Sequence, residues 1–217
     1  MNILDKEYDK LLFVHIPKTA GTSISKILND NNLDNWSRGY PRHHDPYFYL
    51  NYNNQIDDKV FSFSVVRNPY TRTYSSYKQL NKARKTDISF MQYLNNILEK
   101  NISNNTSFLH SPESFYVSGK ENEIPDNTSL IHLPQSFYVI GQEDKIQVTK
   151  LYKFENLKEL ENDLNCNIEF YNVGDYTKDM YNQEYSSTAI EIVKQMYDSD
   201  FVNFGYTTDF NSTREAK

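Results

Sequence analysis

The sequence predicts an α/β protein with a P-loop-like central parallel sheet that is flanked by helices. Strand-like and helix-like segments alternate along the chain, and this alternation favours a parallel sheet covered on both faces. Apolar runs at residues 11–16 and 60–66 each lead into a turn and then into helical spacing. With 217 residues the chain is long enough for a sizeable core, and we expect a single domain over residues 1–217.

The first apolar run predicts a buried strand, a tight loop and the N-terminus of a helix. The run breaks at Pro17, and apolar residues then recur at helical spacing at Ile24, Ile27 and Leu28. Such a loop directs backbone N–H groups and the positive end of a helix dipole at one point. Lys18 adds a positive charge. Hydroxyl groups follow at Thr19, Thr22 and Ser23. We interpret residues 18–23 as an anion-binding loop for phosphate.

The second apolar run, residues 60–66, also predicts a buried strand. Asn68 and Pro69 end it, and proline is common at the first position of a helix. Tyr70, Tyr74, Tyr77 and Leu80 then mark one helical face. Between the two runs, residues 29–58 are polar and rich in turn residues, which rules out a long helix there.

The remaining chain predicts more helices and two more short strands. Asp87 is a candidate cap for a helix that carries Phe90, Leu94, Ile97 and Leu98. Residues 101–127 are polar, and we expect a surface excursion that could act as a mobile lid. Strands are expected within residues 129–140 and 150–157. Helices are expected around Leu157 to Leu164 and Ile190 to Tyr197.

The amino-acid composition indicates which binding partners are excluded and in which cell compartment the protein is expected. The chain has 23 Lys and Arg against 29 Asp and Glu, a formal net charge of −6, so a global basic field for nucleic acid is absent. The one cysteine, Cys166, excludes an intramolecular disulfide and a cysteine zinc site. We find no apolar run long enough for a signal peptide or a membrane span, and we expect a soluble, cytoplasmic protein.

A second anion site is expected where the second strand ends. Arg67 directly follows that strand, and Ser75 lies eight residues later in the helix. If the two strands are neighbours in a parallel sheet, their carboxyl ends open onto the same crevice. The planar guanidinium of Arg67 and the hydroxyl of Ser75 at that position could both bind a phosphate. Two sites side by side fit a ligand with two separated phosphate positions better than one with a single phosphate chain.

The loop at residues 18–23 does not match GxxxxGK[ST], the phosphate-binding motif of nucleotide triphosphatases. Lys18 precedes Gly21 instead of following a final glycine, and no strand ending in an Mg²⁺-binding Asp follows. A divergent phosphotransferase or nucleotide hydrolase remains an alternative, as does a non-catalytic nucleotide- or sugar-binding module.

The segment FVHIPKTAGTS, Phe13–Ser23, resembles the 5′-phosphosulfate loop of sulfotransferases that use 3′-phosphoadenosine-5′-phosphosulfate (PAPS). VVRNPYTRTYSSY, residues 65–77, resembles their 3′-phosphate motif. HIPKTAG followed by VRNPYxR is similar to the carbohydrate sulfotransferases related to heparan sulfate 2-O-sulfotransferase, including small bacterial members. The resemblance continues in order through LPQS (Leu133–Ser136), KFENL (Lys153–Leu157) and YDSDFVNFGY (Tyr197–Tyr206), and it spans almost the whole chain.

The resemblance implies a role for each motif residue. Lys18 would contact the 5′-phosphate and the bridging oxygen and stabilise charge on the leaving group. The 5′-phosphate would be wrapped by Thr19, Ala20, Gly21, Thr22 and Ser23. Arg67 and Ser75 would bind the 3′-phosphate. The implied chemistry is direct in-line sulfuryl transfer to a hydroxyl, without a covalent enzyme intermediate or a metal, leaving 3′-phosphoadenosine-5′-phosphate.

The acceptor hydroxyl needs a base, and RHHDPY offers His43 and His44 between the two anion motifs. In the related enzymes a histidine from this region acts as general base, and we favour His43, with Asp45 as an orienting group. His15 is expected to be structural, and His132 is a weaker candidate for the base or for acceptor binding.

Arg72 and the basic residues at 78–85 can each be interpreted in two ways. Arg72 is either a second phosphate contact or a solvated helix or salt-bridge residue. The basic residues at 78–85 form either a solvated helix face or a patch that meets an acidic sugar chain. A glycan, a glycolipid and a small metabolite all stay open as the acceptor.

Overall fold

The computed structural model describes residues 8–30, 46–47, 50–51, 56–103, 131–141, 145–171, 174 and 177–215. The chain divides into two compact units. The first comprises residues 1–67, 111–131 and 135–172, and the second comprises residues 68–110, 132–134 and 173–217. The first unit holds the sheet, and the described part of the second is helical. The single domain expected over residues 1–217 stays a prediction.

The sheet of the first unit has three parallel strands in the order β1-β2-β3. They are β1 (Lys10–Val14), β2 (Val60–Val66) and β3 (Lys150–Lys153). Val14 pairs with Ser64 and Val66 pairs with Lys153. The carboxyl ends of all three strands therefore lie at one edge of the sheet, as predicted for the two strands that precede the anion motifs.

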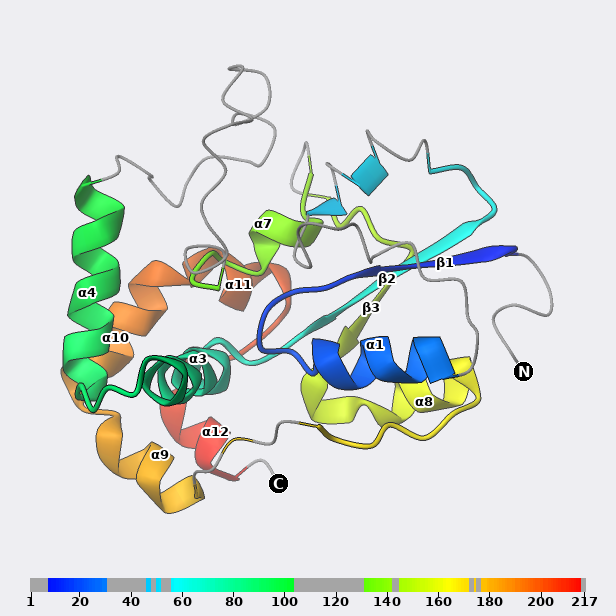
Figure 1. Cartoon of the computed structure of the whole chain (residues 1–217). Coiled ribbons are helices and arrows are strands. Elements are labelled where there is room, and N and C mark those ends of the chain that lie inside the picture. The colour runs from blue at the N-terminus through cyan, green and yellow to red at the C-terminus, as the bar shows by residue number, and fades with distance from the viewer. Residues whose placement is uncertain are drawn as a thin grey trace. The chain divides into compact units, whose positions relative to one another are not determined.

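Helices α1 (Gly21–Asp30) and α8 (Lys158–Leu164) lie together along one face of the sheet (Figure 1). A buried cluster joins them to the strands, and its members include Phe13, Phe63, Ile24, Leu28 and Leu160. Side chains on the other face are buried too, since β2 is buried along its whole length and β1 is buried at every position after Lys10. The predicted α/β class, with a parallel sheet flanked by helices, is confirmed. The P-loop-like character stays a prediction.

β3 is fixed to α8 by the carboxylate of Asp163. The Nζ of Lys150 and the hydroxyl of Tyr152 each donate to Asp163 Oδ2 over 2.6 Å. Burial opposes the charge on this carboxylate, but the two hydrogen bonds outweigh it and lower the pKa of Asp163. The chain continues from β3 into a short 3-10 helix, η4 (Phe154–Asn156), at the carboxyl edge of the sheet.

The strand expected within residues 129–140 is wrong for the part that the structure describes. Residues 136–139 form a short helix, α7 (Ser136–Val139), and Ile140 makes an isolated antiparallel bridge with Ile146. β2 already has a partner on each side, so this apolar run does not pair with β2.

The second unit is a group of helices around an aromatic core. They are α3 (Pro69–Arg84), α4 (Phe90–Ser103), α9 (Lys178–Glu184), α10 (Ser187–Met196), α11 (Asp198–Asn203) and α12 (Phe210–Glu215). The core includes the predicted face Tyr70, Tyr74 and Tyr77. α3 begins as predicted at Pro69, with the side chain of Asn68 accepting the Tyr70 N–H over 3.0 Å.

The cap of α4 differs from the prediction. Ser89, not Asp87, precedes the helix, and its Oγ accepts the Gln92 N–H over 3.2 Å. The side chain of Gln92 accepts the Ser89 N–H over 2.8 Å in return. This reciprocal pair is a capping box. The prediction chose Asp87 because it is acidic, whereas the cap is formed by a serine and a glutamine three residues later.

Replacing Ser89 by Ala should lower the free energy of unfolding by about 1 kcal/mol, because one N–H at the start of α4 loses its acceptor. Asp87→Ala is the matched control and should change it by less than about 0.5 kcal/mol. Urea unfolding monitored by circular dichroism measures both values. A larger loss in the Asp87 variant would contradict the assignment of the cap.

Candidate functional site

The loop between β1 and α1, residues 15–20, forms a tight turn that leads into the helix. The hydroxyl of Thr19 donates to the Ile16 carbonyl over 2.8 Å and closes the turn. Lys18 has φ 71° and Ala20 has φ 68°. For residues with a side chain, this left-handed conformation costs about 1–2 kcal/mol each. Strain of this kind is often found at functional sites.

α1 begins directly after this loop with N–H groups that no carbonyl of the helix accepts. Its first helical hydrogen bond runs from the Ile24 N–H to the Ala20 carbonyl over 3.1 Å. The N–H groups of Gly21, Thr22 and Ser23 therefore have no acceptor within the helix. Together with the helix dipole they make a site for an anion, as the sequence predicts.

The predicted hydroxyl groups of this loop have different environments. Thr19 is fully buried and its hydroxyl is donated to Ile16. Ser23 is also buried, and its Oγ accepts the Tyr171 N–H over 2.9 Å. Thr22 is exposed. The expectation that residues 19–23 wrap a phosphate stays a prediction, and the backbone N–H groups are the donors that support it.

His15 fills the space beside the first residue of α1. Its half-buried ring is stacked on Phe13 with 5.5 Å between the ring centroids. A Cβ added at Gly21 would lie 1.6 Å from His15 Nε2. Glycine is required here by the close approach of the imidazole. This contact agrees with the structural role expected for His15.

Arg67 reaches the loop from the end of the neighbouring strand. Its Nη1 donates to the Lys18 carbonyl over 3.3 Å. Its guanidinium carbon lies 4.1 Å from the centroid of the Phe154 ring, in the segment that follows β3. The half-buried guanidinium is thus held between the ends of all three strands. The structure brings Arg67 and the Lys18 loop together.

Gln135 holds the main chain of Arg67 on both sides. Its Oε1 accepts the Arg67 N–H over 2.8 Å, and its Nε2 donates to the Arg67 carbonyl over 2.8 Å. Gln135 is fully buried. Sequence reasoning did not assign a role to Gln135 or Phe154. Their positions inside the LPQS and KFENL blocks were the signal that could have identified them.

Ser75 belongs to the second unit and is singled out by its hydroxyl. Other hydroxyls of α3 donate to carbonyls three or four residues earlier: Thr71 to Asn68, Thr73 to Pro69 and Ser76 to Arg72. Within the described residues no such bond is found for Ser75, which is 9% exposed. Its hydroxyl is thus suited to bind a ligand. The pairing of Ser75 with Arg67 stays a prediction, since they belong to different compact units.

Arg72 is not the solvated helix residue that was one of its interpretations. It is 2% exposed, and its Nη1 donates to the Leu133 carbonyl over 3.0 Å. Its guanidinium carbon lies 5.9 Å from the centroid of the Tyr197 ring. Arg72 therefore holds the first residue of the LPQS segment in place.

The predicted bases, His43 and His44, lie outside the described residues. So does Asp45, and so does the expected excursion beyond Ser103, where α4 ends. Among the residues that the structure does describe, no group of three His, Cys, Asp or Glu side chains could hold a metal ion. In the same part of the chain, no helix is long and apolar enough to cross a membrane.

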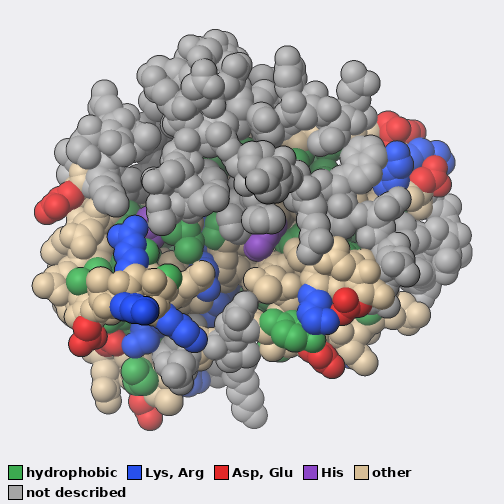
Figure 2. All heavy atoms as spheres, viewed as in Figure 1, with side chains coloured by type: hydrophobic (Ala, Val, Ile, Leu, Met, Phe, Trp, Pro, Cys, Tyr) green, Lys and Arg blue, Asp and Glu red, His purple; other side chains and the backbone are tan. Residues whose placement is uncertain are grey.

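The basic residues at 78–85 lie on the last part of α3 and just after it, where Figure 2 shows Lys and Arg side chains gathered. Lys82, Arg84 and Lys85 are exposed. Lys78 is half-buried, and its Nζ lies 5.5 Å from the centroid of the Tyr77 ring. The cations at 82 and 84 also complement the negative end of the α3 dipole.

Gly21→Ala should lower the free energy of unfolding by about 1–3 kcal/mol, because the added methyl overlaps the His15 ring. His15→Ala removes the ring and makes room for it. The double variant should therefore recover part of the loss, and a double-mutant cycle from thermal unfolding measures the coupling. Strict additivity of the two single changes would contradict the contact.

Comparison with known proteins gives a family match that includes these features. The family model for the sulfotransferase family matches residues 1–170. Neither the curated proteins nor the solved structures show a significant match to this chain. The matched range includes the Lys18 loop, Arg67, Ser75 and Gln135, and it covers well over half of the chain. The chain therefore belongs to the sulfotransferase family and is a transferase of sulfuryl groups.

Proposed function

We propose that the protein transfers a sulfuryl group from PAPS to a hydroxyl of a carbohydrate or glycan precursor. 3′-Phosphoadenosine-5′-phosphate would be the second product. The hydrogen bond from Arg67 Nη1 to the Lys18 carbonyl is the main support, because it joins the two predicted anion motifs at one edge of the sheet. A donor with phosphates at two separate positions suits two adjacent cationic groups better than a donor with one phosphate chain does.

The 5′-phosphosulfate is assigned to the loop. The N–H groups at the start of α1 would bind the 5′-phosphate oxygens, and the Lys18 ammonium would neutralise the oxygen that bridges phosphorus and sulfur. Arg67 and Ser75 are assigned to the 3′-phosphate. The Arg67 guanidinium packs against the Phe154 ring. The hydroxyl of Ser75 makes no hydrogen bond to its own helix within the described residues.

The transfer itself would be a direct in-line displacement. The acceptor oxygen forms a bond to sulfur while the bond from sulfur to the bridging oxygen breaks. That oxygen keeps the electron pair and becomes part of the 5′-phosphate, where Lys18 stabilises its charge. The proton of the acceptor hydroxyl passes to a histidine of the 43–44 pair. Catalysis of this kind depends on positioning and on fixed positive charge.

A carbohydrate acceptor is proposed because the HIPKTAG and VRNPYxR motifs are similar to those of sulfotransferases related to heparan sulfate 2-O-sulfotransferase. The phosphotransferase alternative is not favoured, because the match is to the sulfotransferase family.

Arg67→Ala should weaken binding of 3′-phosphoadenosine-5′-phosphate much more than binding of adenosine 5′-phosphate. Loss of a charge-assisted hydrogen bond costs about 1.5–3 kcal/mol. This corresponds to roughly 10- to 150-fold in Kd. Titration calorimetry with both nucleotides measures the difference. Arg84→Ala is the matched control, since Arg84 is an exposed arginine at the end of α3. Equal losses for both nucleotides would remove Arg67 from the 3′-phosphate.

Ser75→Ala should likewise weaken only the nucleotide with a 3′-phosphate, by about 0.5–1.5 kcal/mol for one hydrogen bond. Thr73→Val is its control, because the hydroxyl of Thr73 is already donated to the Pro69 carbonyl over 2.7 Å. If Thr73→Val has the larger effect on this nucleotide, the assignment of Ser75 fails.

His43→Ala and His44→Ala should have different effects. Loss of the general base lowers kcat by about 100-fold or more. Binding of 3′-phosphoadenosine-5′-phosphate should stay unchanged in both variants. Sulfate transfer from labelled PAPS to a panel of glycans measures the first quantity, and calorimetry measures the second. Full turnover in both variants would show that neither histidine is the base.

A further inference from the structure

The segment that follows α8, residues 165–171, is anchored to the first unit at two places. The Ile168 N–H donates to Glu161 Oε1 over 2.7 Å, and the Ile168 side chain lies in the buried cluster that joins α8 to the sheet. The Tyr171 N–H donates to Ser23 Oγ over 2.9 Å. The end of the segment is therefore held against the first turn of α1, where the proposed function places the 5′-phosphate.

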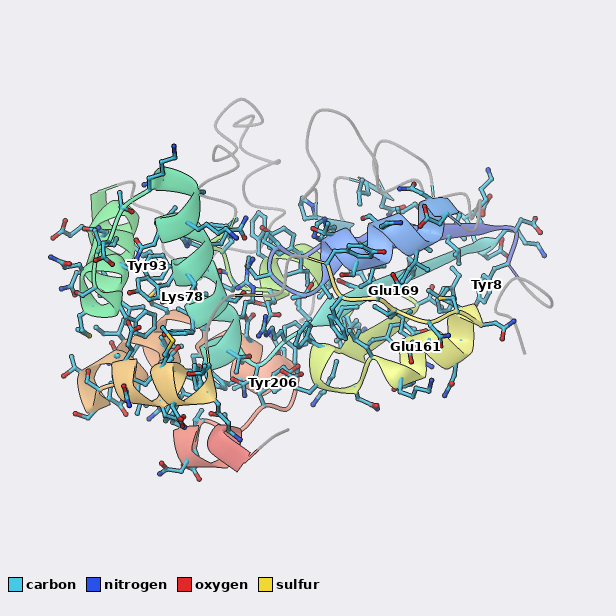
Figure 3. All side chains as sticks on the ribbon, turned by 60° about the horizontal axis from the view of Figure 1, so that its bottom comes forward. Tyr8, Lys78, Tyr93, Glu161, Glu169 and Tyr206 are labelled. Carbon is cyan, nitrogen blue, oxygen red and sulfur yellow. The ribbon has the colours of Figure 1, made fainter. Side chains whose placement is uncertain are left out.

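Phe170 is exposed, although the residues on both sides of it are bonded to their surroundings. Its side chain is 54% exposed. The hydroxyl of Tyr171 donates to Glu169 Oε2 over 2.8 Å, and Lys26 Nζ lies 5.1 Å from the centroid of the Tyr171 ring. Figure 3 shows Glu169 close to α1. Of the two adjacent aromatic rings, that of Phe170 therefore offers the larger uncovered apolar surface, on a backbone that is already fixed.

Phe170 also contacts the ring that packs against Arg67. Its centroid lies 6.0 Å from that of Phe154, and the two rings meet edge to face. The centroid of Phe154 lies 4.1 Å from the guanidinium carbon of Arg67. An edge-to-face pair covers at most one face of the Phe170 ring. Phe170 is thus linked to Arg67 through one ring and to Ser23 through the next residue, and all four residues belong to the first unit.

A ligand that occupies both proposed phosphate sites has a third group to place. In PAPS the two phosphates and the adenine base are attached to one ribose ring, so the base lies close to both phosphate positions. The base is flat and uncharged, and it stacks on aromatic side chains. Phe170 is an exposed aromatic ring with a link to each of the two sites.

We propose that Phe170 is the stacking surface for the purine base of the donor nucleotide, an assignment that rests on the proposed function for its ligand. Ile168 and Tyr171 are positioning residues that fix its backbone. Phe170 lies outside the sequence motifs that indicate the two phosphate sites. Because the donor carries its base before, during and after transfer, stacking strengthens binding in every state and leaves the barrier of the chemical step unchanged.

Titration calorimetry with two ligands tests the stacking. One ligand is 3′-phosphoadenosine-5′-phosphate, and the other is methyl ribofuranoside 3,5-bisphosphate, which carries both phosphates but no base. Phe170→Ala should raise the Kd of the nucleotide by about 5- to 150-fold, as measured for loss of one base–aromatic stack. It should leave the Kd of the base-free compound unchanged. An equal loss for both ligands overturns the proposal, as does an unchanged Kd for the nucleotide.

Two further variants at the same position separate stacking from apolar bulk. Phe170→Trp keeps an aromatic surface and should retain the nucleotide affinity, whereas Phe170→Leu should lose affinity as the alanine variant does. Wild-type affinity in the leucine variant overturns the stacking.

Tyr8→Ala is the matched control for removal of an aromatic side chain from the first unit. Tyr8 precedes β1 at the opposite edge of the sheet, where its ring lies 5.2 Å from that of Phe61 (Figure 3). Both Kd values should stay unchanged in this variant. A loss of nucleotide affinity as large as that of Phe170→Ala would contradict the assignment.

NMR and kinetics supply a second readout. In the complex with 3′-phosphoadenosine-5′-phosphate, the adenine H2 or H8 proton should show a nuclear Overhauser effect to the ring protons of Phe170, with Phe170→Leu identifying the signals. In sulfate transfer, Phe170→Ala should raise KM for PAPS with little change in kcat. Absence of the Overhauser effect, or a loss confined to kcat, overturns the proposal.

Failure of this inference is separate from failure of the proposed function. If the wild type binds 3′-phosphoadenosine-5′-phosphate and PAPS supports transfer, but Phe170→Ala binds the nucleotide as the wild type does, only the role of Phe170 is lost. If the wild type does not bind the nucleotide at all, the proposed donor fails and the stacking role fails with it.

Discussion

The candidate site depends on the parallel pairing of β1 with β2. The last pair of the register joins Val14 to Ser64, and the buried hydroxyl of Ser64 donates to the Val14 carbonyl over 2.7 Å. This pairing brings both carboxyl ends to one edge, where the chain leaves β1 for the loop and leaves β2 at Arg67. A slip of one residue would move the Ser64 hydroxyl away from the Val14 carbonyl, so this hydrogen bond favours the observed register. The contact between Arg67 and Lys18 follows from it.

The strained loop is held by contacts from its own residues and from the neighbouring strand. Lys18 and Ala20 adopt left-handed backbone conformations that are unfavourable for residues with a side chain. Thr19 closes the turn from within, His15 packs against Gly21, and Arg67 donates to the carbonyl of Lys18. These contacts are made by the protein's own residues, and they direct the N–H groups of α1 at one point. A site arranged in this way spends little binding energy on ordering itself.

Local periodicity was enough to predict the strands at 11–16 and 60–66 and the helices that follow them, because their core faces repeat with the expected spacing. The prediction failed where a distant partner decides the structure. Residues 136–139 form a helix, although their apolar run alone is also compatible with a strand. Gln135 bonds to a residue 68 positions away, and no local pattern encodes such a contact. Arg72, polar in the sequence, is buried because the Leu133 carbonyl accepts it.

The hydroxyls of α3 show why residue type alone could not define the site. Thr73, Ser75 and Ser76 are chemically similar, yet two of them donate to carbonyls of their own helix. A hydroxyl satisfied in this way gives up a bond before it can bind a ligand. Ser75 does not bear that cost within the described residues, while the hydroxyl of Ser76, its neighbour, is donated to the Arg72 carbonyl. Adjacent serines of the same helix thus differ: the hydroxyl of Ser76 is used within α3, and that of Ser75 is the one suited to the proposed donor.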